Sequence, residues 1–306
     1  MSIKNIIADS DSFFSLPVKY VFYKYFNKYY KVNDIIEAAE IDSEGDLLIE
    51  LKSGLKISSP PSKYEADHNF TERYKYGDKS KMDKIIDVER FFFLYEVLSE
   101  LYINNEYFVH YDLQKGDVVI DAGANIGGFT LQASRKVGDS GRIYAIEPNE
   151  DNRRTLQKNL KLNNINNCII LTEALWSEKC TKKFFISHRP GEHTLINYDG
   201  DSHFHKQGEI TINCEKLDDL LIKYNIENIK YLKMDIEGAE IEAIKGAGNL
   251  LETQSPYLHI EALHEVNGKP AYLEVIKSIE RHGYKLKKEV DLERGTVQAV
   301  KSLSLT

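Results

Sequence analysis

The sequence predicts an α/β protein whose main sheet is mostly parallel and covered by helices on both faces. From residue 117 onward, short apolar strands alternate with segments of helical periodicity, an order that favours parallel strands joined by crossover helices. A glycine-rich turn joins the first of these strands to its helix. Alternating segments at 284–290 and 295–303 indicate a closing hairpin, so the sheet is expected to end in an antiparallel strand.

The first third of the chain, residues 1–105, is predicted to be an α+β accessory region. Residues 41–58 contain two alternating segments with glycine punctuation, which indicates a β-hairpin or a small meander. The aromatic and basic segment 13–32 favours a helix packed on its own domain, and docking on a membrane surface or a partner stays open. We expect a loop or short irregular helix at 64–84 and a helix at 88–101.

The second domain is predicted to span residues 106–306. A strand at 106–113 is expected to lead into it. The hydrophobic periodicity then predicts strands at 168–175, 229–236 and 257–263, and helices at 151–163, 215–224 and 270–281. Two further strands, 182–187 and 209–214, surround the polar, histidine-bearing insertion 189–208, which is a candidate substrate lid. An exposed loop explains these histidines better than a metal site, because no tight ligand spacing is paired with a carboxylate.

The stretch around the first core strand points to a ligand. This strand, 118–120, ends at Asp121 and is followed by the turn AGANIGG. Gly123 and Gly127 lack the Cβ atoms that would obstruct so tight a turn. A helix at 129–137 begins directly after the turn, and the free backbone N–H groups at a helix start face a bound ligand.

The second core strand adds an acidic residue to this ligand site. Residues 142–146 are apolar and end in Glu147, which lies about twenty residues beyond the turn, where a carboxylate can accept hydrogen bonds from both hydroxyls of a ribose. A glycine turn combined with an acidic strand end predicts a nucleoside pocket.

Details of the turn discriminate between nucleoside cofactors. A dinucleotide-binding turn reads GxGxxG, but here Asn125 replaces the middle glycine, and Asp121 precedes the first glycine by two residues. A negative charge at that place suits a cationic amino-acid cofactor better than a pyrophosphate. S-adenosylmethionine has the required parts, since it carries a sulfonium, an ammonium group and a ribose.

Three motifs occur here in one order: the GANIG turn at 123–127, the EP pair at 147–148 and KMDIEGAE at 233–240. With them, the sequence resembles the FkbM-type S-adenosylmethionine-dependent methyltransferases over roughly residues 106–300. The resemblance implies a Rossmann-like class I methyltransferase fold, with a mostly parallel seven-stranded sheet and an antiparallel last strand. It also implies that upstream strands cover the cofactor side of the catalytic domain.

The cofactor site is predicted from the turn, the second strand end and the ends of two later strands. In methyltransferases of this fold, residues at the end of the third strand usually contact adenine, here through backbone amides and apolar side chains. The predicted cofactor-binding residues are Asp121, Gly123, Ala124, Asn125, Gly127, Thr130, Glu147, Pro148, Asn149, Glu173, Ala174 and Asp235.

The fourth strand carries polar residues on one face, which an internal strand rarely does. Lys233 and Asp235 share this face, so they either form a structural ion pair, with each other or with Asp121, or belong to a reactive site beyond the strand end. Glu237 has the same parity and is expected either to cap the next helix or to touch the ligand.

Methyl transfer to a hydroxyl requires a general base, or a metal that acidifies the hydroxyl, held in line with the sulfonium. Asp235 is the predicted base or metal ligand, assisted by His264 or Glu261, and Lys233 completes the catalytic candidates. Magnesium is considered as a second cofactor, with no ligand named beyond Asp235. The resemblance implies O-methylation of a hydroxyl on a sugar, glycan or related small molecule.

Other functions stay open at this point. A nicotinamide-dependent oxidoreductase would share the fold, and N- or C-methylation would use the same cofactor site. A non-catalytic cofactor-binding module is also compatible if the polar face of the fourth strand is purely structural. Titration with NAD and with S-adenosylmethionine would distinguish an oxidoreductase from a methyltransferase. Acceptor screening would distinguish N- or C-methylation from O-methylation.

Composition limits the partners and the location. The 306-residue chain has a net charge of −8, which argues against binding a phosphate backbone, so no nucleic-acid partner is expected. The three cysteines are widely spaced and contain no CxxC, which indicates reduced thiols rather than a disulfide or zinc framework. Without an apolar run of about 18 residues or a basic leader, a soluble, cytoplasmic protein is expected. A homo-oligomer stays open.

Overall fold

The computed structural model describes residues 31–60, 93–187, 191–197, 206–266, 268–291 and 295–301. The chain divides into two compact units. Unit 1 consists of Met1–Glu106 with Gln157–Asn164, and unit 2 consists of Tyr107–Leu156 with Ile165–Thr306. The expectations for 64–84 and for nearly all of 13–32 lie outside the described residues.

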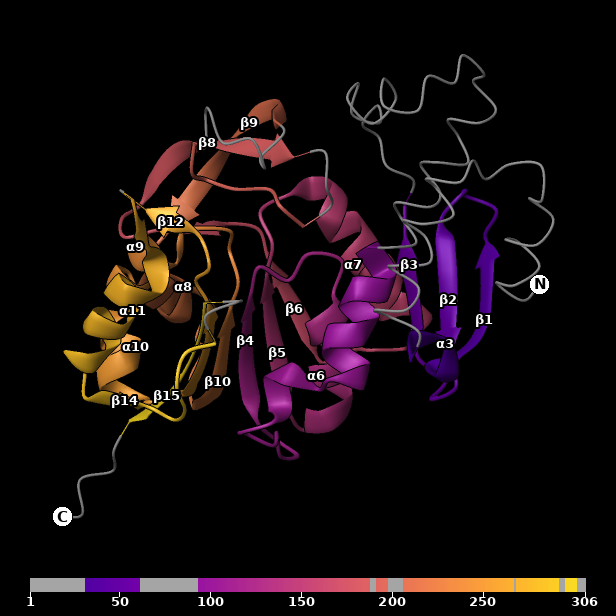
Figure 1. The fold of residues 1–306 in the computed structure, drawn as a ribbon, viewed down its shortest axis with the longest axis horizontal. Helices are drawn as coiled ribbons and strands as arrows, with labels where there is room; N and C mark the ends of the chain where they lie inside the picture. The colour runs from indigo at the N-terminus through magenta and orange to yellow at the C-terminus, as the bar shows by residue number, and fades with distance from the viewer. Residues whose placement is uncertain are drawn as a thin grey trace. The chain divides into compact units, whose positions relative to one another are not determined.

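Unit 1 contains a three-stranded antiparallel sheet, which confirms the meander expected from the alternating segments (Figure 1). A short helix, α3 (Val32–Ile35), leads into β1 (Ile36–Ile41), β2 (Leu47–Leu51) and β3 (Lys56–Ser59). Later in this unit, residues 93–98 are helical and continue into a π-helix, Ser99–Ile103, so the helix is confirmed over the described part of 88–101.

The last two turns of helix α7 (Glu150–Leu162) complete unit 1. Asn159 Oδ1 accepts a hydrogen bond from the Ser58 amide at 2.7 Å, and Asn159 Nδ2 donates to the Ser58 carbonyl at 3.0 Å. One helical turn later, Asn163 makes the same pair of bonds with the backbone of Lys56. Two asparagines, four residues apart on the helix, thus provide hydrogen-bond partners for backbone N–H and C=O groups on the outer edge of β3. At the edge of a sheet these groups would otherwise be unpaired.

Unit 2 is built on a seven-stranded sheet in the order β14-β15-β11-β10-β4-β5-β6. Its strands are parallel except β15, which runs antiparallel to both of its neighbours. The expected sheet with its antiparallel last strand is therefore confirmed. The strands are β4 (Val118–Ala122), β5 (Arg142–Ile146), β6 (Cys168–Leu171), β10 (Ile229–Met234), β11 (Tyr257–Glu261), β14 (Tyr284–Leu286) and β15 (Thr296–Lys301).

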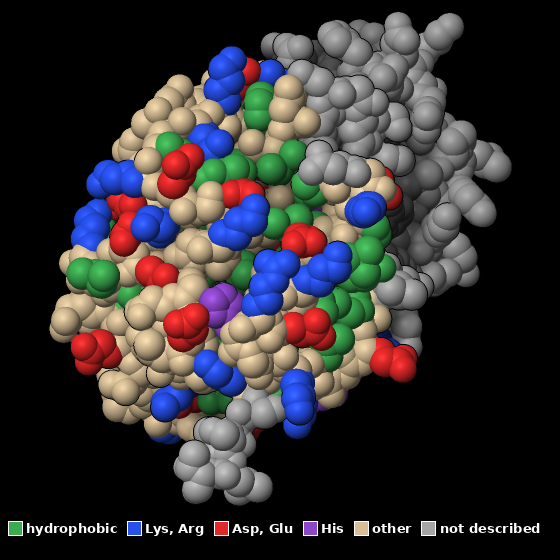
Figure 2. All heavy atoms as spheres, turned by 90° about the vertical axis from the view of Figure 1, so that its left-hand side faces the viewer, with side chains coloured by type: hydrophobic (Ala, Val, Ile, Leu, Met, Phe, Trp, Pro, Cys, Tyr) green, Lys and Arg blue, Asp and Glu red, His purple; other side chains and the backbone are tan. Residues whose placement is uncertain are grey.

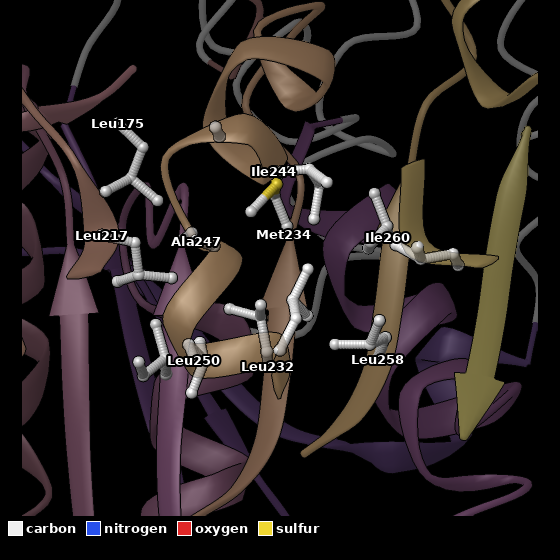
Figure 3. Packing of buried hydrophobic residues seen from close by; sticks show 14 of the residues in the cluster. Leu175, Leu217, Leu232, Met234, Ile244, Ala247, Leu250, Leu258 and Ile260 are labelled. Atoms are coloured by element: carbon white, nitrogen blue, oxygen red, sulfur yellow. The ribbon is translucent and has the colours of Figure 1, made fainter. Parts of the chain in front are cut away.

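One face of this sheet packs on four helices and forms the main core. Leu232 and Met234 of β10 lie beside Leu258 and Ile260 of β11, and all four side chains are fully buried (Figure 3). The covering helices are α8 (Leu217–Tyr224), α9 (Glu240–Lys245), α10 (Gly248–Thr253) and α11 (Ala271–Glu280). The alternation along β10 sends the intervening residues to the opposite face.

On that opposite face, helix α6 (Gly128–Val137) packs its Phe129 ring against Tyr231 of β10, with ring centroids 5.8 Å apart. The strand expected at 106–113 does not form: residues Glu106–Phe108 are a 3₁₀-helix. Phe108 stacks on Phe129, and the Tyr107 carbonyl accepts a hydrogen bond from the Tyr231 hydroxyl. The segment is thus held over the sheet by its buried aromatic side chains and not by strand pairing.

The strand expected at 168–175 is divided between two sheets. Its first part is β6 of the main sheet, whereas β7 (Ala174–Leu175) pairs with β9 (Lys206–Glu215). Strand β9 also pairs with β8 (Cys180–Ser187), which gives a small sheet in the order β7-β9-β8. The described part of the insertion between β8 and β9 is 191–197. A short hairpin, β12 (Glu265–Val266) and β13 (Lys269–Pro270), precedes α11.

Candidate cofactor and catalytic site

A pocket opens at the carboxyl ends of β4, β5 and β10, where ligands bind in sheets of this type. The turn after β4 contributes Gly123 and Asn125, and the loop after β5 contributes Glu147 and Pro148. Ala174 and Asp235 are the other predicted cofactor-binding residues that line the pocket. Residues that approach from four separate segments of the chain therefore meet at one place.

The Glu147 carboxylate is fixed at this pocket by two backbone donors. The Asn125 amide donates to Oε2 and the Asn149 amide donates to Oε1, both at 2.8 Å. Asn125 adopts φ of +50°, a left-handed conformation that asparagine tolerates better than most residues and that turns its N–H toward the carboxylate. Burial raises the pKa of Glu147 to about 7, although both amide bonds oppose that shift.

This pKa leads to a prediction about pH. If the ionised carboxylate accepts the ribose hydroxyls, adenosine affinity should be roughly tenfold weaker at pH 6 than at pH 8, because the binding-competent fraction falls in proportion. Adenosine is the suitable probe, since the amino group of the intact cofactor would add its own titration. Calorimetric titration across this range measures the effect, and an affinity that does not change with pH would contradict it. Glu147→Gln should abolish the pH dependence.

Asp121 and Thr130 lie beneath the turn and do not line the pocket. The Thr130 hydroxyl donates to the Asp121 carboxylate, and Lys233 Nζ lies 3.4 Å from the other carboxylate oxygen. Lys233 also donates to the Gly123 carbonyl at 2.9 Å. Lys233 therefore forms a buried ion pair with Asp121 beneath the glycine turn and does not line the pocket, whereas Asp235 of the same face does line it.

Four other predicted cofactor residues do not line the pocket. The Ala124 amide donates to the Ile146 carbonyl at 3.1 Å, and Gly127, with φ of +98°, begins helix α6. The Asn149 side chain accepts the Asn152 amide, as an N-terminal helix cap does. Glu173 accepts a hydrogen bond from Lys223 at 2.5 Å, outside the pocket lining.

The predicted catalytic residues are only partly brought together. Asp235 lines the pocket, and so does Glu237, whose Oε2 lies 2.8 Å from His264 Nε2. His264 therefore reaches the pocket through Glu237, and burial, opposed by the His264 hydrogen bond, raises the pKa of Glu237. Glu261 is not among the lining residues and has His259 Nε2 at 3.9 Å.

Of the two roles left open for Glu237, the capping role is taken by the next glutamate in the motif. Glu240 is completely buried, and its Oε1 accepts the amides of Ile236 and Gly238 at 3.0 and 3.2 Å. Glu240 thus closes the turn before α9, and Glu237 is free of that role. Glu237 itself has φ of +57°, a strained conformation of the kind that occurs at functional sites.

Strand β8 and the insertion after it supply a wall of the pocket that sequence reasoning did not foresee in detail. Phe184, His193 and Leu195 line the pocket. Backbone hydrogen bonds join Thr194 to Phe185 of β8, and the Thr194 hydroxyl donates to the Glu237 carbonyl at 2.5 Å. These contacts attach the described part of the insertion to the loop after β10. Nothing in its polar composition signals the lining residues.

Among the described residues, one group of three side chains could hold a metal ion, and it belongs to unit 1, whereas the predicted catalytic residues belong to unit 2. Asp42, Glu44 and Asp46 surround the ammonium of Lys158, with N–O distances of 2.6 to 2.8 Å. Lysine already supplies the positive charge there. Asp235, Glu261 and His264 do not form such a group.

The fold and the pocket define unit 2 as a class I methyltransferase fold. A family model described as the methyltransferase FkbM domain matches residues 121–286, and the chain belongs to this family. It is 29% identical to Methyltransferase 1 of Beauveria bassiana over 143 residues (42% of this chain, 57% of that protein). It is also 29% identical to methyltransferase sdnD of Sordaria araneosa over 161 residues (44% and 62%).

The matches to these curated relatives thus span about 60% of their length. Among solved structures, the chain is similar to methyltransferase FkbM of Methylobacillus flagellatus, with a TM-score of 0.44 and 19% identity, covering 76% of this chain and 57% of that one.

Proposed function

We propose that this protein transfers a methyl group from S-adenosylmethionine. The supporting observation is the Glu147 carboxylate, fixed by two amides at the edge of a pocket that also contains the glycine turn and Asp235. A carboxylate at this strand end suits the ribose hydroxyls, and acidic residues suit a sulfonium and an ammonium group. Family membership supports the same reaction class.

The test is calorimetric binding of S-adenosylmethionine, its demethylated product and NAD, with and without magnesium. We expect heat with the first two compounds, no heat with NAD and no requirement for magnesium to bind the cofactor. Correctly folded protein that binds neither adenosyl compound would contradict the proposal, and binding of NAD alone would favour an oxidoreductase.

The proposed acceptor is a hydroxyl on a sugar, a glycan or a related small molecule, with Asp235 as general base and His264, held by Glu237, assisting. Asp235 lines the pocket, and its side chain is 34% exposed, so it is accessible to an acceptor. The remainder of catalysis is positioning, because an in-line displacement requires the acceptor oxygen to be held against the methyl group with water excluded.

We predict that Asp235→Asn binds S-adenosylmethionine within a few fold of the unsubstituted protein but loses roughly 10²–10⁴ in turnover, the usual contribution of a general base. Release of the demethylated product from a panel of sugar and glycan acceptors measures turnover. Glu252→Gln is the matched control, because Glu252 lies in the same unit, is exposed and does not line the pocket. Unchanged turnover in Asp235→Asn would exclude Asp235 as the base.

Further proposals concern partners and location. Residues 1–105 are proposed to act as an accessory region that covers the substrate or joins copies of the chain, and the protein is proposed to work in the cytoplasm without nucleic acid. On the face shown in Figure 2, Lys and Arg side chains are interspersed with Asp and Glu rather than gathered in one basic patch. This distribution supports the proposal that the protein works without nucleic acid. None of the helices in the described part of the chain is both long and apolar enough to cross a membrane.

A further inference from the structure

Two of the three cysteines, distant in the sequence, lie opposite each other in the small sheet. Cys180 of β8 and Cys214 of β9 are direct partners in the antiparallel register. Such partners have Cα atoms about 4.5 or 5.5 Å apart, and both values lie within the roughly 4.4–6.8 Å span that a disulfide bridges. Partners in register also point to the same face of a sheet.

The two side chains are already in contact as thiols. Both cysteines are free, and the Cys180 thiol is hydrogen-bonded to the Cys214 thiol. Cys214 is 1% exposed, whereas Cys180 is partly exposed. Burial, together with the neighbouring Cys180, raises the pKa of the Cys214 thiol to about 12. A reagent from solution therefore meets Cys180 first.

We propose that Cys180 and Cys214 form a reversible disulfide, which makes the β8–β9 hairpin a redox-sensitive wall of the pocket. The oxidant is a low-molecular-weight disulfide such as oxidised glutathione. The Cys180 thiolate attacks it, forms a mixed disulfide and releases one glutathione thiolate. Cys214 then loses its proton to solvent and attacks Cys180 Sγ, which releases the second glutathione. Two protein thiols are oxidised, and one small disulfide is reduced to two thiols.

The position of the pair connects it to the pocket. Cys214 is the register partner of Ala174 in the parallel pairing of β7 and β9, and Ala174 lines the pocket. On β8, Phe184 lies four residues beyond Cys180 and lines the same pocket. A covalent link between β8 and β9 would therefore join two strands that border residues of the proposed adenine site.

The chain contains a natural reporter for this reaction. Trp176 is the only tryptophan in the sequence. Its amide donates to the carbonyl of Glu215, the residue after Cys214, at 3.0 Å, and its ring lies under Lys182, two residues beyond Cys180. Tryptophan emission should thus change when the disulfide forms and recover when it is reduced.

The experiment treats the full chain with oxidised glutathione and counts free thiols. We expect the number to fall from three to one, a cross-linked peptide pair containing residues 180 and 214, and recovery of three thiols with dithiothreitol. The thermal midpoint should rise by several degrees, because a link that fits the native register restricts only the unfolded chain. Cys168→Ser should still lose two thiols, whereas Cys180→Ser and Cys214→Ser should form no internal disulfide.

Several outcomes would overturn this inference: three thiols that resist oxidation, a mixed disulfide on Cys180 that never resolves, a cross-link to Cys168, or a lowered midpoint. The experiment requires neither cofactor nor acceptor, so its result is independent of the proposed methyl transfer.

Discussion

Gly123→Ala is expected to abolish cofactor binding and to destabilise unit 2 by about 2–5 kcal/mol. The residue has φ of +78°, and an added Cβ would lie 1.8 Å from the Asp235 carbonyl oxygen. The positive φ costs alanine about 1–2 kcal/mol, and forcing the added Cβ into the packed site costs about 1–3 kcal/mol more. Because Asp235 is the residue approached, the substitution would also displace the pocket wall that Asp235 provides.

A matched control separates the clash from the backbone conformation. Gly268 lies in the same unit with φ of +71°, but no atom lies within 4 Å of an added Cβ. Gly268→Ala should therefore lower the stability only by the cost of alanine at a positive φ and should leave affinity for S-adenosylmethionine unchanged. Urea unfolding and calorimetry measure the two effects. Equal destabilisation by both substitutions would show that the contact with Asp235 does not decide the result.

The parts of the site that could be predicted from the sequence are those fixed within one short segment. The glycine turn and Glu147 are set by a strand, a tight bend and a second strand end, and each has a local signature. The structure brings Gly123, Asn125 and Glu147 to one pocket for that reason. The mostly parallel sheet follows from the alternation of strands and helices, and its antiparallel strand follows from the closing hairpin pattern.

The parts that could not be predicted depend on contacts between distant segments. Glu237 and Glu240 both follow the fourth strand, and only the fold shows that one meets His264 while the other accepts two amides. Phe184 and His193 reach the pocket because β8 pairs with β9, which no local pattern specifies. The aromatic residues at 107 and 108 resemble a strand in sequence, but they are buried by packing on Phe129 and not by strand pairing.

Lys233→Met is predicted to destabilise unit 2 by about 3–5 kcal/mol, the cost of leaving a buried charge without its partner. The side chains of Lys233 and Asp121 are 5% and 0% exposed. Burial alone would lower the pKa of Lys233, but the nearby carboxylates of Asp121 and Asp235 outweigh it and raise that pKa. Lysine therefore stays charged, and methionine would remove the cation while its similar volume keeps the packing.

A double-substitution cycle isolates the pair from other effects. Asp121→Asn together with Lys233→Met should cost clearly less than the sum of the single substitutions, because no unpaired charge is left behind. Lys230→Met, on an exposed position of the same strand, is the control and should change stability by less than about 0.5 kcal/mol. Strictly additive costs in urea unfolding would mean that Asp121 and Lys233 do not depend on each other. The glycine turn would then be held mainly by the hydrogen bond from Lys233 to the Gly123 carbonyl, and Asp121→Asn alone would leave cofactor affinity intact.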